Sequence, residues 1–389
     1  MSEACQRLGV QPQTIYAYVS RGKLEVMVDP DNRRRSLYRA EDLVGLARRK
    51  QTGRKRETVA QDTLFGAQPS IPTSLTTFFR GRLYYRGRDA VDLARSATLE
   101  EAARLLWDAQ QPADFSSAAR ARHADAPGRN AAFTALACLA ATAHSTRGRL
   151  THVLQAEGQG LVGMLATAFG AAPGSQPLHL RFAKAWKQPA AVADLLRAAM
   201  VLLADHELTS SAFATRIAAS TGASLPACLL AGLCTLSGPS HGDASGRVQA
   251  LFSEVKRLGD EQVIGQYLSA GLPIAGFGHP IYPDGDPRAA ALLALCEPPP
   301  AIARFIEKVT RLTGLQPNID TALASMVAHH KLPADAAFSL FAPARSVGLL
   351  AHSLEQLATD QLIRPRGRYL GPAPEAAQSP LSPTGRPRR

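Results

Sequence analysis

The chain has few cysteines and few aromatic residues, and it lacks a long apolar run. Its 389 residues include five cysteines without a Cys-x-x-Cys pair, so the sequence indicates neither a disulfide framework nor a metal cluster. The apolar run around Leu225–Leu236 contains Pro226 and Gly232 and is too short to span a bilayer. The start of the chain, MSEACQRLGV, has no apolar stretch, so we expect no secretory signal. These absences predict a cytoplasmic protein.

The charge of the chain is unevenly distributed. The formal net charge is +12, and residues 1–60 hold 13 Lys or Arg against 7 Asp or Glu, which is half of the excess. The hydrophobic content of 46% is that of a globular protein. A concentrated positive charge favours contact with phosphate, and a solubilising surface is the alternative interpretation.

The first residues carry a helix-turn-helix pattern. In EACQRLGVQPQTIYAYVSRGKL, Ala4 is small enough to pack on the second helix and Gly9 permits the turn. Val10 and Ile15 are placed to bury the junction between the two helices. The pattern predicts a small DNA-binding domain over residues 1–50, and a helical appendage used for oligomer contacts is the alternative.

A hairpin is predicted after these helices. The DPDN turn at 29–32 lies within residues 24–38, which are rich in Val, Met and Arg. The side chains predicted to contact DNA are Gln13, Thr14, Tyr16 and Arg21 in the major groove and Arg33, Arg34 and Arg35 on the phosphates. Over about 50 residues, the segment resembles a winged helix-turn-helix of the MerR or excisionase type.

Beyond a charged linker at 51–69, the chain is predicted to be mainly α-helical. Phe78, Phe79, Tyr84 and Tyr85 flank a glycine and indicate one small hairpin. Alanine- and leucine-rich segments predict helices at 99–109, 130–145, 158–170, 190–204, 209–236, 244–258, 260–270, 286–296, 299–314, 320–330 and 346–361. The tail, residues 373–389, is rich in Pro, Ser and Arg and is expected to be disordered.

Three polar segments carry the candidate chemistry: GPSHG at 238–242, GFGHPIYPDGDPRA at 276–289 and PNID at 317–320. Glycines on both sides of His241 expose its imidazole at a helix start, where the neutral form can donate a hydrogen bond to an enolate oxygen. An arginine at a helix start suits a substrate carboxylate, and an aspartate there is by default a cap. Together these residue types suit deprotonation of a carbon acid beside two polarised carbonyl groups.

In this order and spacing, the segments strongly resemble the citrate synthase family. Further matching stretches are YRGRDAVDLA (85–94), LEEAARLLW (99–107), ADHELTSSAFATRIAAST (204–221), FAPARSVGLLAHSLEQ (341–356) and RPRGRYLGP (364–372). The resemblance implies a helical homodimer in which a large domain (70–242 and 331–372) and a small domain (243–330) close over the substrates. It also implies condensation of acetyl-CoA with oxaloacetate and hydrolysis of citryl-CoA, without a metal or redox cofactor.

The resemblance also implies the role of each site residue. Asp320 would remove the acetyl methyl proton, His241 would stabilise the enolate, and His279 would polarise and protonate the oxaloacetate carbonyl. The oxaloacetate carboxylates would be held by His206, Arg288, Arg345 and Arg364, of which Arg364 would reach the site of the partner subunit. The CoA pocket would be bordered by Ala275, Gly276, Phe277, Gly278 and Asn318.

Three positions depart from the family pattern. Asp243 replaces the second glycine after the histidine, and its carboxylate is expected to raise the pKa of His241. Pro280 replaces an arginine, and Leu349 replaces an aromatic residue. Two alternatives to citrate synthase remain: a 2-methylcitrate synthase that uses propionyl-CoA, and a DNA-binding regulator that uses this domain as a metabolite sensor.

Overall fold

The computed structural model describes residues 4–5, 14–15, 18–19, 24–29, 32–39, 42–43, 71–116 and 126–365, with the backbone alone at 28–29 and 32–35. The chain divides into two units, Met1–Pro72 and Thr73–Arg389. Each unit has its own hydrophobic core. The predicted linker and the predicted disordered tail lie outside the described residues.

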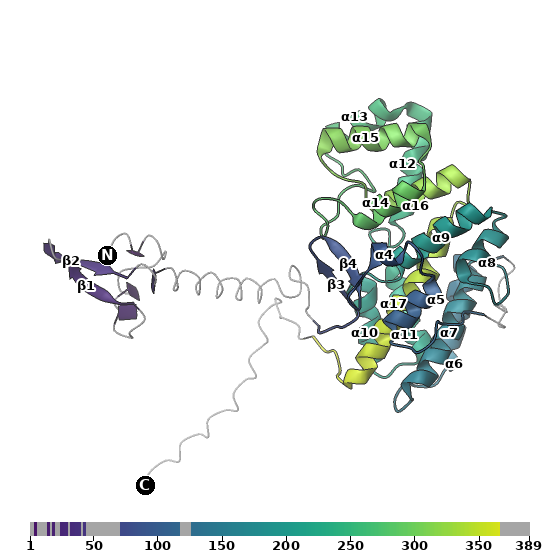
Figure 1. The fold of residues 1–389 in the computed structure, drawn as a ribbon, viewed down its shortest axis with the longest axis horizontal. Coiled ribbons are helices and arrows are strands. Elements are labelled where there is room, and N and C mark those ends of the chain that lie inside the picture. The colour runs from purple at the N-terminus through teal and green to yellow at the C-terminus, as the bar shows by residue number, and fades with distance from the viewer. Residues whose placement is uncertain are drawn as a thin grey trace, which may run out of the picture. The chain divides into compact units, whose positions relative to one another are not determined.

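The described part of the first unit contains one hairpin. Strands β1 (Val26–Asp29) and β2 (Asn32–Tyr38) pair antiparallel, which confirms the hairpin predicted from the sequence (Figure 1). Ala4, Ile15, Leu24 and Leu43 are buried together beside it. Ala4 and Ile15 are therefore core residues, as the helix-turn-helix pattern requires. The winged helix-turn-helix itself stays a prediction.

A second small sheet opens the larger unit. Strands β3 (Thr76–Phe79), β4 (Arg82–Tyr85) and β5 (Arg88–Asp89) are antiparallel in that order, with Phe78 opposite Leu83. The hairpin predicted from the aromatic residues is confirmed. The hydroxyl of Tyr85 is buried and lies 3.1 Å from the carbonyl oxygen of Asp205. This contact fixes the sheet beside Asp205, which directly precedes the predicted site residue His206.

Helices make up most of the larger unit, as predicted. Their bounds are α4 (Ala90–Leu93), α5 (Leu99–Leu106), α6 (Arg129–Thr142), α7 (Thr151–Ala168), α8 (Leu178–Ala185), α9 (Ala190–Leu203), α10 (Ser210–Ser220), α11 (Leu225–Leu236), α12 (Ala244–Leu258), α13 (Asp260–Ser269), α14 (Pro287–Leu295), α15 (Pro300–Thr313), α16 (Ile319–His330) and α17 (Ala336–Thr359). Among the described residues, no helix is long and apolar enough to cross a membrane.

Three helix predictions are corrected. The single helix expected at 209–236 is two helices, because Ser224 caps α11 and Pro226 occupies its first turn. Helix α8 was not expected. Helix α17 begins ten residues earlier than predicted and continues through Pro343, which is buried in its interior. Proline costs a helix interior about 3 kcal/mol, so burial of almost all of this helix outweighs the local preference.

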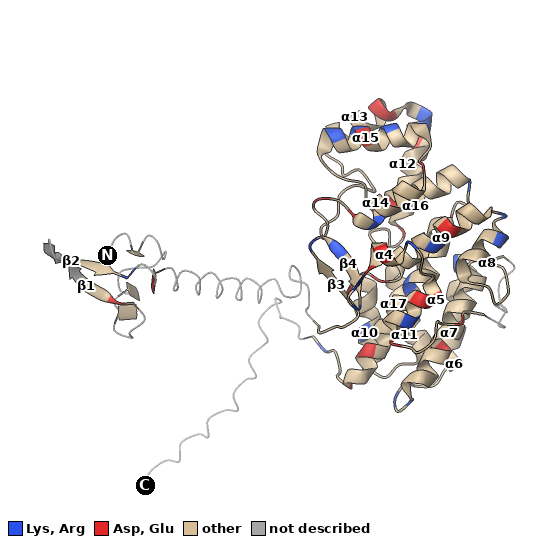
Figure 2. Cartoon of the chain, in the orientation of Figure 1, with Lys and Arg blue, Asp and Glu red and all other residues tan. Residues whose placement is uncertain are grey.

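Helix α17 runs through the centre of the main core (Figure 1). It packs against α5, α7, α9, α10 and α11. Figure 2 shows that α11 carries no charged side chain, whereas α13 and α15 both carry charged side chains. A second, smaller core joins α12, α13 and α15 with Ile274 and Phe277. The loop that contains Phe277 therefore begins in the smaller core and leads to α14, whose buried apolar residues belong to the main core.

Candidate active site

His206 lies in the turn that follows α9 and is buried. Its ring meets the ring of Phe78 edge-on at 5.0 Å and the ring of His279 at 5.4 Å, and its Nε2 lies 3.0 Å from the hydroxyl of Tyr282. Burial lowers the pKa of His206 well below its usual value, and the positive charges of Arg288 and Arg345 add to the effect. His206 is therefore a neutral side chain at pH 7.

His241 lies in a tight turn between α11 and α12. The turn closes through the N–H of Gly242, which donates to the carbonyl of Leu236 at 2.9 Å. A Cβ atom at position 242 would lie 2.7 Å from the side chain of Leu236, so only glycine fits there. Ser211 Oγ lies 2.8 Å from His241 Nε2. Burial, followed by the charge of Arg345, lowers the pKa of His241 to about 4.

His279 follows a loop that packs closely on α16. Gly276 has a φ of +87°, and a Cβ atom there would lie 2.2 Å from Thr321 Oγ1, so the close approach requires glycine. Thr321 Oγ1 donates to the carbonyl of Gly276 at 2.6 Å. The N–H of Ile281 donates to His279 Nδ1 at 3.2 Å, so the proton of the neutral ring is on Nε2. Burial lowers the pKa of His279, and Arg288 lowers it further.

Asp286 and Arg288 form a buried pair at the start of α14. Asp286 accepts hydrogen bonds from the backbone N–H of Arg288 at 3.0 Å, from its Nε at 3.0 Å and from one terminal nitrogen at 2.8 Å. The N–H of Ile319 donates to the same carboxylate at 3.1 Å, which ties α14 to the start of α16. Burial opposes the charge of Asp286, but Arg288 prevails and lowers its pKa.

Asp320 lies in the first turn of α16 but does not cap it. Asn318 is the cap, because its Oδ1 accepts from the N–H of Asp320 at 3.0 Å. The Oδ1 atom of Asp320 is buried without a hydrogen-bond partner among the described residues. Burial raises the pKa of Asp320 to about 7, against the attraction of Arg288 and with the repulsion of Asp286. This value suits a general base at neutral pH.

Arg345 is buried in the middle of α17. Its Nε donates to the carbonyl of Leu203 at 2.9 Å, and its guanidinium lies 5.0 Å from the ring centre of Phe341. Its two terminal nitrogens have no acceptor among the described residues. Burial lowers the pKa of Arg345, and Asp205 opposes this effect. Arg345 is therefore an available donor for an anion.

Together these side chains combine neutral hydrogen-bond donors, buried cations and one poised carboxylate. Such a set can remove a proton from a weak carbon acid and stabilise the oxyanion that results. The described residues contain no group of three or more His, Cys, Asp or Glu side chains arranged to hold a metal ion. The absence of a metal cofactor stays a prediction.

Comparison with known proteins gives the family. The family described as "Citrate synthase, C-terminal domain" matches residues 67–366. The chain belongs to the citrate synthase family.

Curated relatives of this family match part of the chain. "Putative citrate synthase 2" of Mycobacterium tuberculosis is 34% identical over 192 residues, which are 46% of this chain and 52% of that protein. "Citrate/2-methylcitrate synthase" of Bacillus subtilis is 36% identical over 188 residues, which are 44% of this chain and 50% of that protein. The matched region thus spans about half the length of these relatives.

Solved structures give the fold over more of the chain. Citrate synthase from Thermotoga maritima has a TM-score of 0.68 at 22% identity and covers 81% of this chain and 97% of its own. A Thermoplasma acidophilum citrate synthase, solved as a ternary complex with carboxymethyl coenzyme A and oxaloacetate, has a TM-score of 0.66 at 21% identity and covers 79% and 96%. The larger unit therefore has the citrate synthase fold.

The departures from the family pattern can now be located. The expectation that Asp243 raises the pKa of His241 is wrong, because burial and then the charge of Arg345 lower that pKa. The carboxylate of Asp243 pairs with Arg129 instead. Pro280 is exposed beside His279. Leu349 is fully buried in α17 and belongs to the main core.

The residues predicted to border the CoA pocket are the loop directly before His279 and Asn318, which contacts that loop. Ala275 is partly buried and Phe277 packs against Phe305. Asn318 donates from Nδ2 to the carbonyl of Gly278 at 3.1 Å, so this amide holds the loop itself. We therefore assign Asn318 a supporting position rather than a free donor for CoA.

The remaining predicted residues belong to the end of the described chain, to the first unit or to segments outside the described residues. Arg364 is exposed near the end of the described chain. Of the predicted DNA contacts, Thr14 is in a helical stretch, and Arg33, Arg34 and Arg35 are described by their backbone in β2. Gln13, Tyr16 and Arg21 are outside the described residues.

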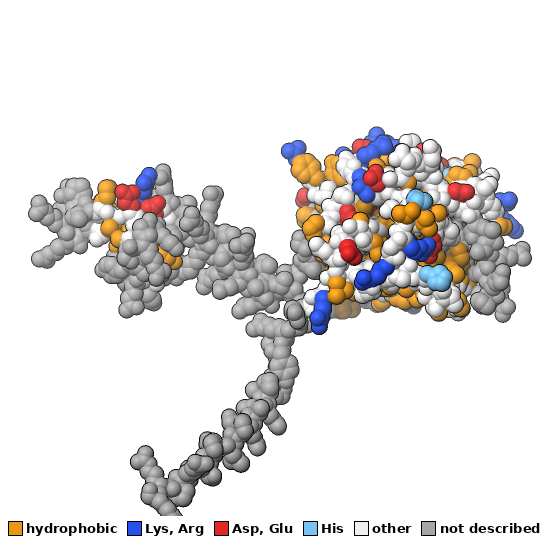
Figure 3. Space-filling model, turned by 90° about the horizontal axis from the view of Figure 1, so that it is seen from below, with side chains coloured by type: hydrophobic (Ala, Val, Ile, Leu, Met, Phe, Trp, Pro, Cys, Tyr) orange, Lys and Arg blue, Asp and Glu red, His pale blue; other side chains and the backbone are white. Residues whose placement is uncertain are grey.

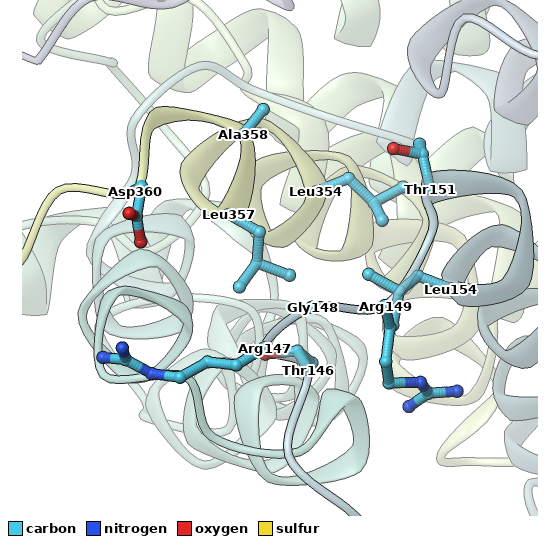
Figure 4. Close-up of a pocket in the computed structure, with 10 residues that line it drawn as sticks. All are labelled: Thr146, Arg147, Gly148, Arg149, Thr151, Leu154, Leu354, Leu357, Ala358 and Asp360. Carbon is cyan, nitrogen blue, oxygen red and sulfur yellow. The ribbon is translucent and has the colours of Figure 1, made fainter.

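The pocket drawn in Figure 4 is not this site. It has a volume of about 470 Å³ and lies between the start of α7 and the end of α17. Arg147, Arg149, Leu357 and Asp360 are among its lining residues, and none of the predicted site residues lines it. Arg149 is paired with Glu157 at 2.6 Å.

Four contact residues of the site were missed from the sequence: Ser211, Tyr282, Asp286 and Arg129. Asp286 had a usable signal, because an aspartate directly before a proline at a helix start is a common cap. The other three side chains have no local pattern that distinguishes them, since their partners lie far away in the sequence.

Proposed function

We propose that the protein is an enzyme that condenses a short acyl-CoA with oxaloacetate and hydrolyses the resulting thioester. The observation that carries this proposal is the contrast between neutral His241 and His279 and the acid Asp320, whose pKa is about 7. Membership of the citrate synthase family and the shared fold support it.

The first chemical step is removal of a methyl proton from the acyl thioester. The carboxylate of Asp320 takes the proton, and the electron pair of the C–H bond moves to the thioester oxygen as an enolate. Neutral His241 donates from Nδ1 to that oxygen. We assign the Ser211 hydroxyl, 2.8 Å from Nε2, as the donor to that nitrogen, which fixes this tautomer. The pKa of about 4 keeps His241 neutral, so it stabilises the enolate as a hydrogen-bond donor.

The second step forms the carbon–carbon bond. The enolate carbon attacks the ketone carbon of oxaloacetate, and the ketone oxygen takes the proton of His279 Nε2 as it becomes a hydroxyl group. The proton that Asp320 took from the methyl group then returns to His279 Nε2 through water, so that both side chains regain their starting forms. Backbone donation from Ile281 to Nδ1 keeps the proton of neutral His279 on the nitrogen that must give it. Water then hydrolyses the citryl thioester and releases CoA.

The substrate carboxylates are assigned to the buried cations. Among the described residues, Arg345 has two terminal nitrogens without an acceptor, whereas Arg288 has one, because Asp286 accepts from its other nitrogens. His206 adds a neutral donor beside them. We assign a further contact to Arg364 of the partner subunit.

A homodimer is part of this proposal. Leu139 on α6, Leu150 and Val153 at the start of α7, and Ile217 on α10 are exposed large apolar side chains. Seen from below, the larger unit has apolar side chains spread among charged ones (Figure 3). A second copy of the chain would bury such side chains and supply Arg364.

The acyl donor is proposed to be acetyl-CoA, and propionyl-CoA is the second candidate. The likeness to a relative named "Citrate/2-methylcitrate synthase" favours testing both.

The deciding experiment measures CoA release by the purified full chain with a thiol reagent. Acetyl-CoA and propionyl-CoA are run in parallel, each with and without oxaloacetate. Oxaloacetate-dependent release supports the proposal, and the ratio of the two kcat/KM values identifies the donor. Folded, dimeric protein that releases no CoA with either thioester would contradict it and favour the metabolite sensor.

DNA binding by residues 1–50 is proposed separately. The basic charge of this segment, its β1–β2 hairpin and the shared core of Ala4 and Ile15 support it. A titration with duplex DNA at several salt concentrations tests it, because phosphate contacts predict a linear fall of log K with log salt concentration. Binding that does not change with salt would contradict it.

A further inference from the structure

Asp243 makes an ion pair that joins three helices. Its carboxylate accepts two hydrogen bonds from Arg129, one of them from Nη1 to Oδ2 at 3.0 Å and the other from Nη2 to Oδ1. Arg129 is the first residue of α6, and its guanidinium lies 3.9 Å from the ring centre of Phe338 on α17. Asp243 stands directly before α12, so the pair connects the starts of α6 and α12 over α17.

Neither residue stabilises the helix end at which it lies. Asp243 stands at the cap position of α12, yet its side chain caps no backbone N–H. Arg129 places a positive charge at the N-terminus of α6, where the helix dipole disfavours it. Both side chains are also partly exposed, and exposed ion pairs contribute little to stability. The local structure and the stability of the fold therefore give little reason for this pair.

The position of the pair relates it to the chemistry. Asp243 follows His241 by two residues, and the N–H of Ala244 donates to the carbonyl of His241 at 3.1 Å. The negative charge of Asp243 also acts on Asp320, where it opposes ionisation. Without its partner, Asp243 would leave an uncompensated negative charge two residues from His241 and close enough to act on Asp320.

The other charged groups around these two residues are accounted for. Arg345 and the Ser211 hydroxyl face His241. Arg288, Asp286 and Arg247 act on Asp320 together with Asp243. Only Arg129 makes a described ion pair with Asp243.

We propose that Arg129 is a positioning residue, which acts through Asp243 to hold the turn that carries His241 and to neutralise the carboxylate beside the reacting groups. Its kinetic consequences rest on the proposed function. The aspartate and its arginine act as a unit, so removing the arginine alone is harmful and removing both is not.

The test compares Arg129→Gln, Asp243→Gly, the double variant and a control, Arg257→Gln. Arg257 is an exposed arginine in the last turn of α12. Its replacement also removes one positive charge, but at the opposite end of α12 from Asp243. Two readouts are taken on the full chain. The imidazole of His241 is titrated by NMR with histidine-selective labelling and assigned with His241→Gln, and kcat and KM for oxaloacetate are measured against pH.

We expect Arg129→Gln to raise the titration midpoint of His241 and the acidic midpoint of kcat, each by about half a pH unit or more. We expect kcat at pH 7 to fall about 3- to 10-fold while KM changes less than twofold. The double variant should return to within twofold of the parent, and Arg257→Gln should match the parent.

A loss in Arg129→Gln that Asp243→Gly does not rescue, with an unchanged His241 midpoint, would overturn the proposal, because a purely structural arginine behaves in that way. If the parent protein shows no turnover, the proposed function fails on its own. The NMR midpoints of Arg129→Gln and of the double variant then still decide the role of Arg129.

Discussion

Two buried carboxylates lie close together in this site and have opposite environments. Asp286 accepts four N–H donors and its pKa is lowered, whereas Asp320 keeps one oxygen without a partner and its pKa is raised to about 7. Asp286 caps α14, and Asp320 lies in the first turn of the neighbouring helix α16. Because both carboxylates are buried and both lie near Arg288, the difference between their pKa values comes from the number of hydrogen-bond donors that each accepts.

This contrast gives Asp286 a structural role and Asp320 a chemical one. A carboxylate that is saturated with donors is a poor base and a good anchor, and one that is buried without donors is the reverse. Asp286 thus anchors Arg288 and the start of α16, and in doing so it keeps its charge away from solvent. Asp320 can take up a proton because its buried Oδ1 has no hydrogen-bond donor among the described residues.

The largest expected effect is on turnover after Asp320→Asn. The amide has the same shape but cannot accept the substrate proton, so kcat should fall about 10³-fold. The measurement is oxaloacetate-dependent thiol release, with circular dichroism to verify folding and oxaloacetate binding as the control. A variant that retains a tenth of the parent rate would show that Asp320 is not the base.

Asp286→Asn should act on stability. It leaves Arg288 buried without a counter-ion, and breaking a buried pair in this way costs about 3–5 kcal/mol. Urea unfolding measures the loss. Asp284→Asn is the matched control, because Asp284 is exposed in the same loop and should change the free energy of unfolding by less than about 0.5 kcal/mol. Equal effects of the two variants would contradict the anchoring role.

Because the pKa of Asp320 is raised, Asp320→Asn should increase the free energy of unfolding at high pH, whereas Asp286→Asn should decrease it. The folded protein holds this proton up to about pH 7, whereas the unfolded chain releases it near pH 4. The free energy of unfolding should therefore fall as the pH rises from about 4 to 7, by up to about 4 kcal/mol. The asparagine variant lacks this loss, so it should equal the parent at pH 4 and exceed it at pH 8. Parallel stability curves from pH 4 to 8 would exclude a raised pKa.

The same contrast marks how far the sequence alone could lead. Periodicity predicted most helices, and the order of the three polar segments predicted that His241, His279 and Asp320 belong to one site. No local pattern indicates how the charge of Asp243 is neutralised, because Arg129 lies 114 residues away. Likewise, the continuation of α17 through Pro343 depends on burial by neighbouring helices.

The smallest expected effect concerns the cap that leaves Asp320 free. Asn318 caps α16 through Oδ1 and holds Gly278 through Nδ2, so Asp320 does not have to serve as the cap. Asn318→Ala should cost about 1 kcal/mol of stability, since the N–H of Asp320 loses its acceptor. Asn318→Ser keeps a capping oxygen and should lose less, although both variants lose the bond to Gly278. Thermal unfolding of the two variants separates the cap from the loop contact. Equal losses would mean that the contact with Gly278 matters more, and that the cap is not what keeps the Asp320 carboxylate available.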